Sequence, residues 1–283
     1  QRQMCIRDSP ETLLGFLADM EFRTLTKRVS DQFKITAPAI LKTIQGEAGS
    51  DETSKLQDFI NKSYTRVSEM AELELWVARS HERGFVAVDT ETTGLNDMRA
   101  DLVGISLCVE AGAACYIPLT HKNAGGDDLF GSDALAEGQL DLDAVLTVLK
   151  PLLQDPAVLK IGQNMKYDAK ILARYGVTIA PIDDTMLLSY ALHAGLHGHG
   201  MDALSDRYLN HTPIPIKPLL GSGKSAITFD RVPMDEAVPY AAEDADITLR
   251  LWHLFKPRLH TAQVTRVYDC LLYTSDAADD LFR

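Results

Sequence analysis

The sequence predicts an α/β fold, a mixed β-sheet flanked by helices, for most of the chain. Three strand-like segments, residues 85–89, 102–110 and 113–119, follow one another with short connections. Beyond residue 141, helical periodicity alternates with a further short strand. Strands that come first and are followed by alternating helices are typical of a mixed sheet with helices packed on its faces.

Local signals delimit the expected elements. The apolar run FVAVD turns at Thr93 and Gly94, a glycine separates the next two strands, and Pro156 stops the helix that begins near 141. A loop rich in proline and glycine, 212–224, precedes the longest helix. The expected strands cover 85–89, 102–110, 113–119 and 157–162. The expected helices cover 69–82, 141–154, 164–175, 184–194, 201–210 and 234–256.

The compact α/β segment occupies residues 63–260, and a helix and a linker precede it. Residues 10–29 carry apolar side chains at helical spacing and predict one amphipathic helix and its exit. Residues 30–62 are poor in aromatic residues and rich in Ser, Thr, Lys and acidic residues, which is typical of a linker.

Both ends of the chain differ from the rest. QRQMCIRDS (1–9) and CLLYTSDAADDLFR (270–283) fit neither the helical nor the strand period, and they resemble translated adapter remnants. We predict that these flanks are not native, and that residues 261–283 comprise the start of a connection to a further domain followed by this tail.

Composition excludes several classes of protein. Hydrophobic residues make up 46% of the 283 residues and charged residues 24%, which excludes a mainly disordered chain, a collagen-like repeat and a disulfide mini-scaffold. No apolar run approaches the ~20 residues of a membrane helix, and residues 1–10 lack the apolar core of a signal peptide. We therefore expect a cytoplasmic protein without a membrane partner.

The cysteines and the net charge narrow the possibilities further. Cys5, Cys108, Cys115 and Cys270 lack metal-ligand spacing, and we expect buried reduced thiols, although Cys108 and Cys115 could instead meet across a hairpin. The formal net charge of −12 argues against binding long duplex DNA by phosphate neutralisation alone. A nucleic-acid enzyme of this charge needs a short local footprint, bound cations or a partner domain.

Three short patterns carry the functional signal. Asp89 and Glu91 stand two residues apart at the end of an apolar strand and therefore point into one space. Asn164 and Asp168 share one helical face. Tyr240 and Asp244, in YAAEDAD, do the same on the long helix. Taken singly, each pattern also fits a chance triplet or a solvated helix face.

Convergence of the patterns would place four carboxylates, those of Asp89, Glu91, Asp168 and Asp244, in one pocket. Like charges a few ångströms apart repel and raise one another's pKa. Divalent cations relieve this repulsion, and hard oxygen ligands suit Mg²⁺ or Mn²⁺. We therefore expect two divalent metal ions, ~4 Å apart, which can clamp the attacking and leaving oxygens of a phosphodiester.

The order DTETTGL, GQNMKYD and YAAEDAD resembles the proofreading 3′-5′ exonuclease domain of bacterial DNA polymerase I. That domain belongs to the DnaQ-like exonuclease superfamily, which has a ribonuclease-H-like fold and a tyrosine-type, four-acid signature. The resemblance spans about 63–260. Residues 10–29 further resemble the stretch that follows the 5′-nuclease domain in the same polymerases. The resemblance implies a chain cut from a longer polymerase, and only 23 residues follow position 260, so we expect no polymerase domain here.

The resemblance also implies roles for individual residues. Asp89, Glu91 and Asp244 would ligate one metal ion, and Asp89 with Asp168 the second. Tyr240 would position the attacking water, because its reference pKa of ~10 makes it a poor base at neutral pH. The residues implied in binding the single-stranded 3′ end of DNA are Thr90, Leu95 (a wedge beside the terminal base), Asn164, Phe229 (a base-contacting aromatic) and Tyr240. Candidate phosphate contacts are Lys160, Lys166, Lys170, Lys217, Lys224 and Arg231, for which a solvated surface role is equally compatible.

Two further patterns are decoys. GSGKS (221–225) lacks the first glycine of a phosphate-binding loop and follows TPIPIKP, which is unsuited to a central strand. His193, His197 and His199 lack the further ligands of a zinc site and fit an exposed glycine-rich loop. Asp184 is predicted to cap a helix.

The predicted activity is metal-dependent 3′-5′ exodeoxyribonuclease proofreading, with release of nucleoside 5′-monophosphates. A ribonuclease D-like exoribonuclease shares the acids and the tyrosine and stays open as an alternative. A non-catalytic spacer between the nuclease and polymerase domains of a longer chain is the other alternative.

Overall fold

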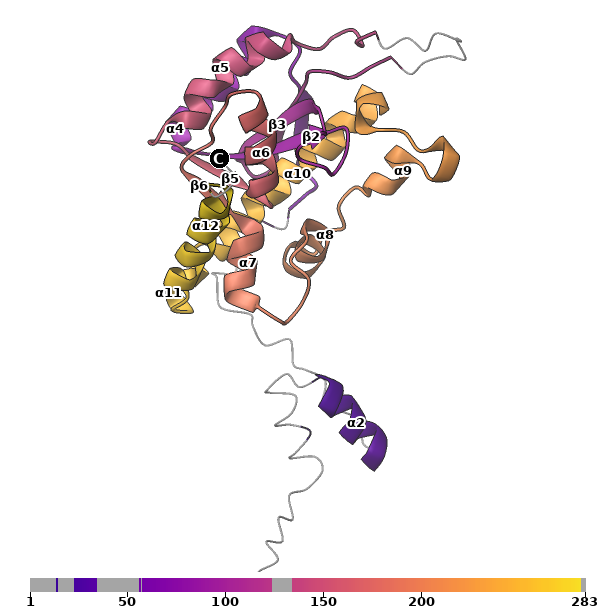
Figure 1. Ribbon diagram of the computed structural model, residues 1–283, viewed down its shortest axis with the longest axis vertical. Coiled ribbons are helices and arrows are strands. Elements are labelled where there is room, and N and C mark those ends of the chain that lie inside the picture. The colour runs from indigo at the N-terminus through magenta and orange to yellow at the C-terminus, as the bar shows by residue number, and fades with distance from the viewer. Residues whose placement is uncertain (1–13, 15–22, 35–55, 57, 124–133, 281–283) are drawn as a thin grey trace, which may run out of the picture. The chain divides into compact units, whose positions relative to one another are not determined.

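One six-stranded mixed sheet organises the protein. The computed structural model (Figure 1) describes residues 14, 23–34, 56, 58–123 and 134–280. The strand order is β1-β4-β3-β2-β5-β6. The strands are β1 (Ser63–Arg66), β2 (Phe85–Thr92), β3 (Leu102–Glu110), β4 (Ala113–Pro118), β5 (Leu159–Gly162) and β6 (Ile182–Asp184). β2, β3 and β4 form an antiparallel meander, while β1, β5 and β6 pair in parallel with β4, β2 and β5.

Helices cover the two faces of the sheet. The helices of the second compact unit, Thr53–Arg283, are α4 (Met70–Arg83), α5 (Leu142–Gln154), α6 (Met165–Arg174), α7 (Thr185–His193), α8 (Met201–Leu204), α9 (Ile216–Leu220), α10 (Met234–Phe255), α11 (Arg258–Thr261) and α12 (Thr265–Asp280). Short helical turns lie at η1 (Ser205–Leu209), η2 (Gly223–Ser225) and η3 (Phe229–Arg231). The first unit, Gln1–Glu52, contains α2 (Arg23–Phe33).

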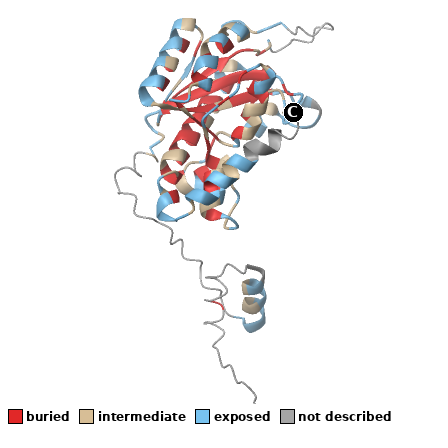
Figure 2. Ribbon diagram, turned by 60° about the vertical axis from the view of Figure 1, so that its left-hand side comes forward, coloured by how far each residue is buried: buried red, intermediate tan, exposed pale blue. Residues whose placement is uncertain are grey.

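Strand alternation assigns the side chains of β2 to two layers. Val86 and Val88 pack in the larger core with α4, α5 and α6, whereas Ala87 packs in a small cluster with α10. Figure 2 shows the sheet as the most deeply buried layer. Because residues two apart on a strand share a face, Asp89 and Glu91 follow Ala87 on the side of α10.

Small side chains let α10 lie close to the sheet. Ala237, Ala241, Ala242 and Ala245 are fully buried along its sheet-facing side. The carboxyl half of α10 packs instead against α7, α8, η1 and α12, where Phe255 and Tyr268 are buried. The longest helix therefore has a small-residue half over the carboxylates and a large-residue half that docks the other helices.

The structure confirms the predicted strands of the α/β segment and all its predicted helices except the continuous one over 201–210, and it adds further elements. β1 and β6 were not predicted, because four polar-rich residues and three residues are too short to show a period. α9, α11 and α12 were also missed, and the predicted helix over 201–210 divides into α8 and the π-helical turn η1. Neither the missed helices nor the division of the helix over 201–210 shows a distinctive apolar pattern in the sequence.

One predicted helix boundary and one predicted non-helical segment are wrong. α2 continues to Phe33, past the expected exit at 29, because no glycine or proline interrupts TKRVSDQF; most of 10–22 lies outside the described residues. The assigned absence of periodicity in 270–283 is also wrong, since α12 runs through Asp280. That the flanks are not native stays a prediction.

Cys108 and Cys115 are buried and unpaired in β3 and β4, as expected. Cys108 faces Ala114 in the register and Cys115 faces Leu107, so the two thiols lie on opposite faces of the sheet. The alternative in which they meet across the hairpin is wrong. Cys5 lies outside the described residues, and Cys270 is exposed on α12.

The position of Lys160 contradicts its prediction as a candidate phosphate contact. Its side chain is fully buried in β5 and its ammonium donates to the backbone carbonyls of Asp155 (2.8 Å), Val158 (2.6 Å) and Ala180. Burial lowers the pKa of Lys160 to about 8, so the group is charged at neutral pH. Lys160 is thus a cross-link between a helix end, a strand and a loop, and not a phosphate contact.

Replacing Lys160 by methionine should lower the free energy of unfolding by about 2–4 kcal/mol, because buried carbonyls lose a charged donor. The matched control is Lys150→Met on the exposed side of α5, which should change stability by less than about 0.5 kcal/mol. Urea denaturation measures both. Equal midpoints for the two variants would show that the buried ammonium contributes nothing.

Candidate functional site

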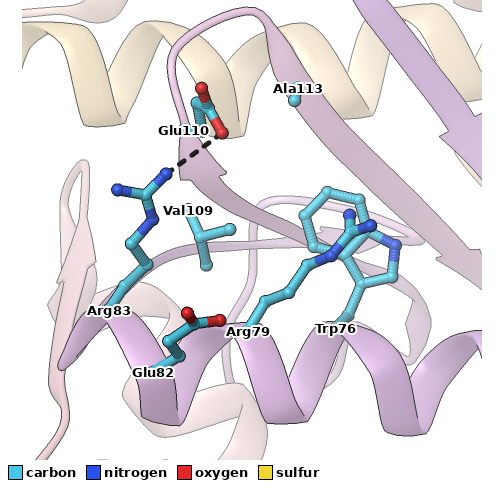
Figure 3. A pocket seen from close by; sticks show the side chains of 7 residues that line it. All are labelled: Trp76, Arg79, Glu82, Arg83, Val109, Glu110 and Ala113. Atoms are coloured by element: carbon cyan, nitrogen blue, oxygen red, sulfur yellow. Dashed lines mark hydrogen bonds and ion pairs between the residues drawn. The ribbon is translucent and has the colours of Figure 1, made fainter.

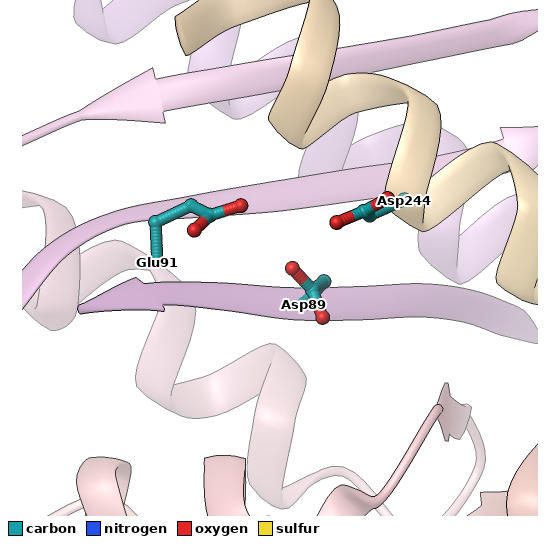
Figure 4. Close-up of side chains that lie close together, drawn as sticks. All are labelled: Asp89, Glu91 and Asp244. Atoms are coloured by element: carbon teal, nitrogen blue, oxygen red, sulfur yellow. The ribbon is translucent and has the colours of Figure 1, made fainter. Parts of the chain in front are cut away.

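Three carboxylates from two elements meet between the sheet and α10. Figure 4 shows the side chains of Asp89 and Glu91 on β2 pointing toward Asp244 on α10. One ligand oxygen from each lies within 4.8 Å of the other two. Within the described part of the chain, no other group of three or more His, Cys, Asp or Glu side chains meets this spacing. The predicted convergence of these three acids is therefore present in the fold.

The fourth carboxylate, that of Asp168, approaches from α6. Asp168 is 3% exposed, and its Oδ1 accepts hydrogen bonds from the backbone N–H of Thr90 (3.1 Å) and from the Thr90 hydroxyl. The charge of Asp168 raises the pKa of Glu91, and the charge of Asp89 raises the pKa of Asp168. Asp168 thus lies beside the other three acids, and the hydroxyl of Thr90 holds its carboxylate.

Burial and repulsion keep these acids from ionising easily. Desolvation, with the charge of Asp244 added, raises the pKa of Asp89 well above its usual range. Desolvation, followed by the charge of Asp89, raises the pKa values of Glu91 and Asp168 well above their usual range. Desolvation raises the pKa of Asp244 to about 8, and the Tyr240 hydroxyl, which donates to Asp244, partly offsets this.

Neighbouring acids on α10 show what the site lacks. Asp246 pairs with Arg250 at 2.8 Å and accepts from Tyr64 and the Gly112 N–H. Glu243 pairs with Lys62 at 3.1 Å. Among the described residues no lysine or arginine pairs with Asp89, Glu91, Asp168 or Asp244.

The difference between the paired acids of α10 and the unpaired acids of the site shows whether the site residues fit a cation. Buried carboxylates are stable when paired with positive charge, which Lys62 and Arg250 supply to the structural acids Glu243 and Asp246. The four unpaired acids offer hard oxygen donors, the ligand type of Mg²⁺ and Mn²⁺. The residues present therefore fit a divalent-cation site.

Tyr240 lies one helical turn before Asp244, at the same mouth of the site. Burial, followed by the charge of Asp244, raises the pKa of Tyr240 far above its usual range. Its ring lies 5.8 Å from that of Phe229, centroid to centroid. Tyr240 is consequently a neutral hydrogen-bonding group and cannot act as a base near pH 7.

The predicted substrate residues differ in accessibility. Leu95 is 97% exposed on the loop after β2, as a wedge requires, whereas Phe229 is 3% exposed beneath Tyr240 and His121. Asn164 is exposed in a left-handed conformation (φ 64°) directly before α6. Phe229 therefore lines the site with little free surface in this conformation.

Two residues near Glu91, Gly104 and Tyr116, were not predicted from the sequence. A Cβ on Gly104, the β3 partner of Glu91, would stand 2.2 Å from the Tyr116 hydroxyl. Tyr116 is fully buried, and it bonds to Nε2 of His121 at 2.8 Å. A glycine inside a strand marks such a close approach, so Gly104 was the available signal.

Tyr167 is a second omission, next to Asp168 in the sequence. Its hydroxyl donates to the carbonyl of Gly94 at 2.6 Å and bonds to the hydroxyl of Thr92. These contacts tie the loop that carries Leu95 to α6. Its position beside a predicted ligand was the only sequence signal for it.

The predicted setting holds for GSGKS and fails for part of the histidine cluster. GSGKS follows α9 and not a strand, so it is no phosphate-binding loop. His199 bonds to Ser189 at 2.9 Å and His197 to Tyr208 at 2.8 Å. His193, however, is buried at the end of α7, so an exposed loop is the wrong description for it.

The remaining basic candidates differ in their surroundings. Lys170 pairs with Asp97 at 3.0 Å, and Lys217 is exposed on α9. The side chain of Lys224 lies outside the described residues. Phosphate contacts by Lys166, Lys170, Lys217, Lys224 and Arg231 stay predictions.

A hollow of about 450 Å³ lies away from the acids, between α4 and the β3–β4 hairpin. Figure 3 shows that Arg83 reaches Glu110 across it, at 3.1 Å. The guanidinium of Arg79 lies over the Trp76 ring at 5.4 Å. Arg83 and Glu110 are thus engaged with each other, and Arg79 with Trp76.

Comparison with known proteins places this site in context. A family model described as 3′-5′ exonuclease matches residues 64–260. DNA polymerase I of Rhizobium leguminosarum is 40% identical over 321 aligned residues, which cover 92% of this chain and 31% of that protein. The chain thus spans about a third of the length of this relative.

Solved structures share the fold. Brucella melitensis NrnC with bound Mg²⁺ aligns with a TM-score of 0.51 at 22% identity, covering 71% of this chain and 86% of NrnC. RNase D of Escherichia coli, an exoribonuclease involved in structured RNA processing, aligns with a TM-score of 0.53 at 18% identity over 74% of this chain and 49% of its own. At these identities the likeness concerns the fold alone, and it confirms the ribonuclease-H-like class.

The raised pKa values predict how stability depends on pH. A carboxylic acid whose pKa is about 4 when unfolded and about 8 in the folded protein favours folding at low pH, and this contribution is lost as pH rises between those values. In chelator, the thermal midpoint of the unmodified chain should therefore fall relative to that of Asp244→Asn between pH 5 and pH 8. Parallel pH profiles for the two proteins would contradict the raised pKa of Asp244.

Proposed function

The chain belongs to the family of 3′-5′ exonuclease domains found in DNA polymerase I, and we propose that it removes nucleotides from DNA 3′ ends. The substrate is a single-stranded or frayed 3′ end, and the products are nucleoside 5′-monophosphates. The observation that supports this most directly is the convergence of Asp89, Glu91 and Asp244 with Asp168 at one opening.

Two divalent cations, Mg²⁺ or Mn²⁺, complete the proposed site. Asp89, Glu91 and Asp244 would hold one cation, and Asp89 with Asp168 the other. When bound, the cations supply the positive charge that activates a water molecule and stabilises the phosphorane-like transition state. This assignment explains why the four acids have no cationic partner among the described residues.

The protein's own groups position the reactants. Tyr240 stays protonated and donates to Asp244, so its role is to orient that carboxylate and the attacking water. Leu95 would wedge against the terminal base. Phe229 would contact that base once Tyr240 and His121, which cover it, move. Base stacking on an aromatic ring tolerates any sequence, as removal of arbitrary mismatches requires.

A short substrate footprint reconciles DNA binding with the acidic composition. A few unpaired nucleotides carry few phosphates, and cations at the site neutralise the charge of the scissile one. Thr90, through its backbone, and Asn164, which is exposed beside Asp168, would contact the terminal nucleotide. In a full-length protein, the partners would be the 5′-nuclease and polymerase domains of the same chain.

The proposed setting is the cytoplasm, where buried Cys108 and Cys115 stay reduced. No helix among the described residues is long and apolar enough to cross a membrane. Proofreading during DNA replication or repair is the corresponding biological role.

An exoribonuclease of the RNase D type is the second candidate, on the strength of the shared fold. The 40% identity to a DNA polymerase I favours DNA over RNA. A non-catalytic spacer is disfavoured because every predicted ligand position holds a carboxylate or the tyrosine.

The activity is tested with a labelled primer that carries a 3′ mismatch, incubated with Mg²⁺. We expect stepwise shortening, which Asp89→Ala should slow by about 10³-fold because several kcal/mol of charge stabilisation are lost. Asp143→Ala, on the exposed face of α5, is the matched control and should retain activity. An oligonucleotide of the same sequence with 3′-ribonucleotides distinguishes the candidates, and faster removal from RNA would favour the RNase D type.

Tyr240→Phe should slow turnover by about 10- to 100-fold, because Asp244 loses the hydroxyl that orients it. Single-turnover kinetics separate this effect from affinity, which should stay nearly unchanged. Tyr190→Phe, on the exposed side of α7, is the control. Weakened substrate affinity with normal turnover would contradict the positioning role of Tyr240.

A further inference from the structure

The position of Asp168 depends on where α6 begins. A tight turn joins β5 to α6, and Asn164 adopts a left-handed conformation there. A Cβ on Gly162 would stand 2.6 Å from the Cε of Met165, so a larger residue there would displace the Met165 side chain at the start of α6. Asp168 follows Met165 by three residues, within the first helical turn.

The amides that start α6 are not capped from within the helix. Asn164, at the N-cap position, makes no side-chain cap hydrogen bond. Instead, Oδ2 of Asp184 accepts from the N–H of Met165 at 2.9 Å, and its Oδ1 accepts from the N–H of Asn164 at 3.2 Å. Asp184 is 4% exposed, on the end of β6.

The same carboxylate also caps α7, as predicted from the sequence. Its Oδ1 accepts from the N–H groups of Met186 (2.8 Å) and Leu187 (3.2 Å). One side chain therefore satisfies amides at the starts of two helices. The two helix N-termini favour its negative charge.

We propose that Asp184 is a positioning residue for Asp168, and thereby for the second cation of the nuclease site. The proposal rests on the proposed function. Asp184 fixes the start of α6 relative to β5 and β6, and thus the distance between Asp168 and Asp89. Groups that orient metal ligands typically affect metal affinity by about 10- to 100-fold when they are removed.

The backbone of Asp184 is held from the other side. Its N–H donates to the Tyr268 hydroxyl at 3.0 Å, and that hydroxyl donates to Asp183 at 2.7 Å. Tyr268→Phe thus removes contacts of α12 to the same strand end without removing the cap of α6. It should lower stability and leave the second cation in place.

A change of charge has to be separated from a change of position. Asp184→Asn keeps the three contacts of Oδ1 but turns an amide donor toward the N–H of Met165. It also removes one negative charge. Asp202→Asn is the matched control for charge, because Asp202 is exposed and acts on Asp244 through its charge alone.

Mn²⁺ binding to the full chain, measured by calorimetry at pH 8, tests the proposal. The unmodified chain should bind two ions, and Asp168→Asn should identify the weaker one by losing it. Asp184→Asn should weaken that ion by about 10- to 100-fold and change the tighter one by less than about twofold. Metal-free hydrogen exchange should be faster at the amides of Asn164 and Met165 in Asp184→Asn.

Three results would overturn the proposal: unchanged affinity for the weaker ion in Asp184→Asn, equal weakening of both ions, or an equal effect of Asp202→Asn. The first result together with intact primer shortening would overturn this proposal alone. An unmodified chain that neither binds two ions nor shortens the primer would overturn the proposed function as well.

Discussion

Buried carboxylates without a compensating protein charge are the constraint on which the rest of this structure depends. An ionised acid away from water is unstable unless positive charge or donors surround it. The fold nevertheless brings Asp89, Glu91 and Asp244 together and adds Asp168 at their side. The strand alternation of β2 and the alanines of α10 both serve that approach.

The treatment of acids along α10 separates structural from functional groups. Asp246 is enclosed by Arg250, Tyr64 and a backbone amide, and it anchors the start of the domain. Arg250 also donates to the carbonyls of Leu56 and Asp58, and its guanidinium lies 4.0 Å from the Phe59 ring centroid. Asp244, two residues from Asp246, has only a neutral tyrosine. The partners of the two acids therefore differ: Asp246 has a cationic partner, and Asp244 has a neutral one.

The functional residues were predictable from sequence to the extent that their geometry is local. Asp89 and Glu91 share a strand face, and Tyr240 and Asp244 share a helix face, so spacing alone relates them. The resemblance to a known family then supplied the convergence that spacing cannot. Lys160 was misassigned because its three carbonyl partners lie on segments that only the fold brings together. Tyr116 over Gly104 and the short strands β1 and β6 depend on tertiary contacts in the same way.

Residues around the acids support their positions, some by direct hydrogen bonds and some through neighbouring loops. Thr90 holds Asp168 across the gap between β2 and α6, and Tyr167 holds the loop that carries Leu95. On the opposite side, the Tyr116–His121 pair lies under Phe229. Burial lowers the pKa of His121 to about 4, so this pair is neutral and adds no cation to the site. This side of the site therefore adds hydrogen bonds and ring contacts but no positive charge.

Anomalous X-ray diffraction from crystals grown with Mn²⁺ tests the central claim most directly. The account predicts a manganese peak enclosed by the carboxylates of Asp89, Glu91 and Asp244, and a second peak between Asp89 and Asp168. A map in which the four side chains contact no manganese at saturating concentration would contradict it.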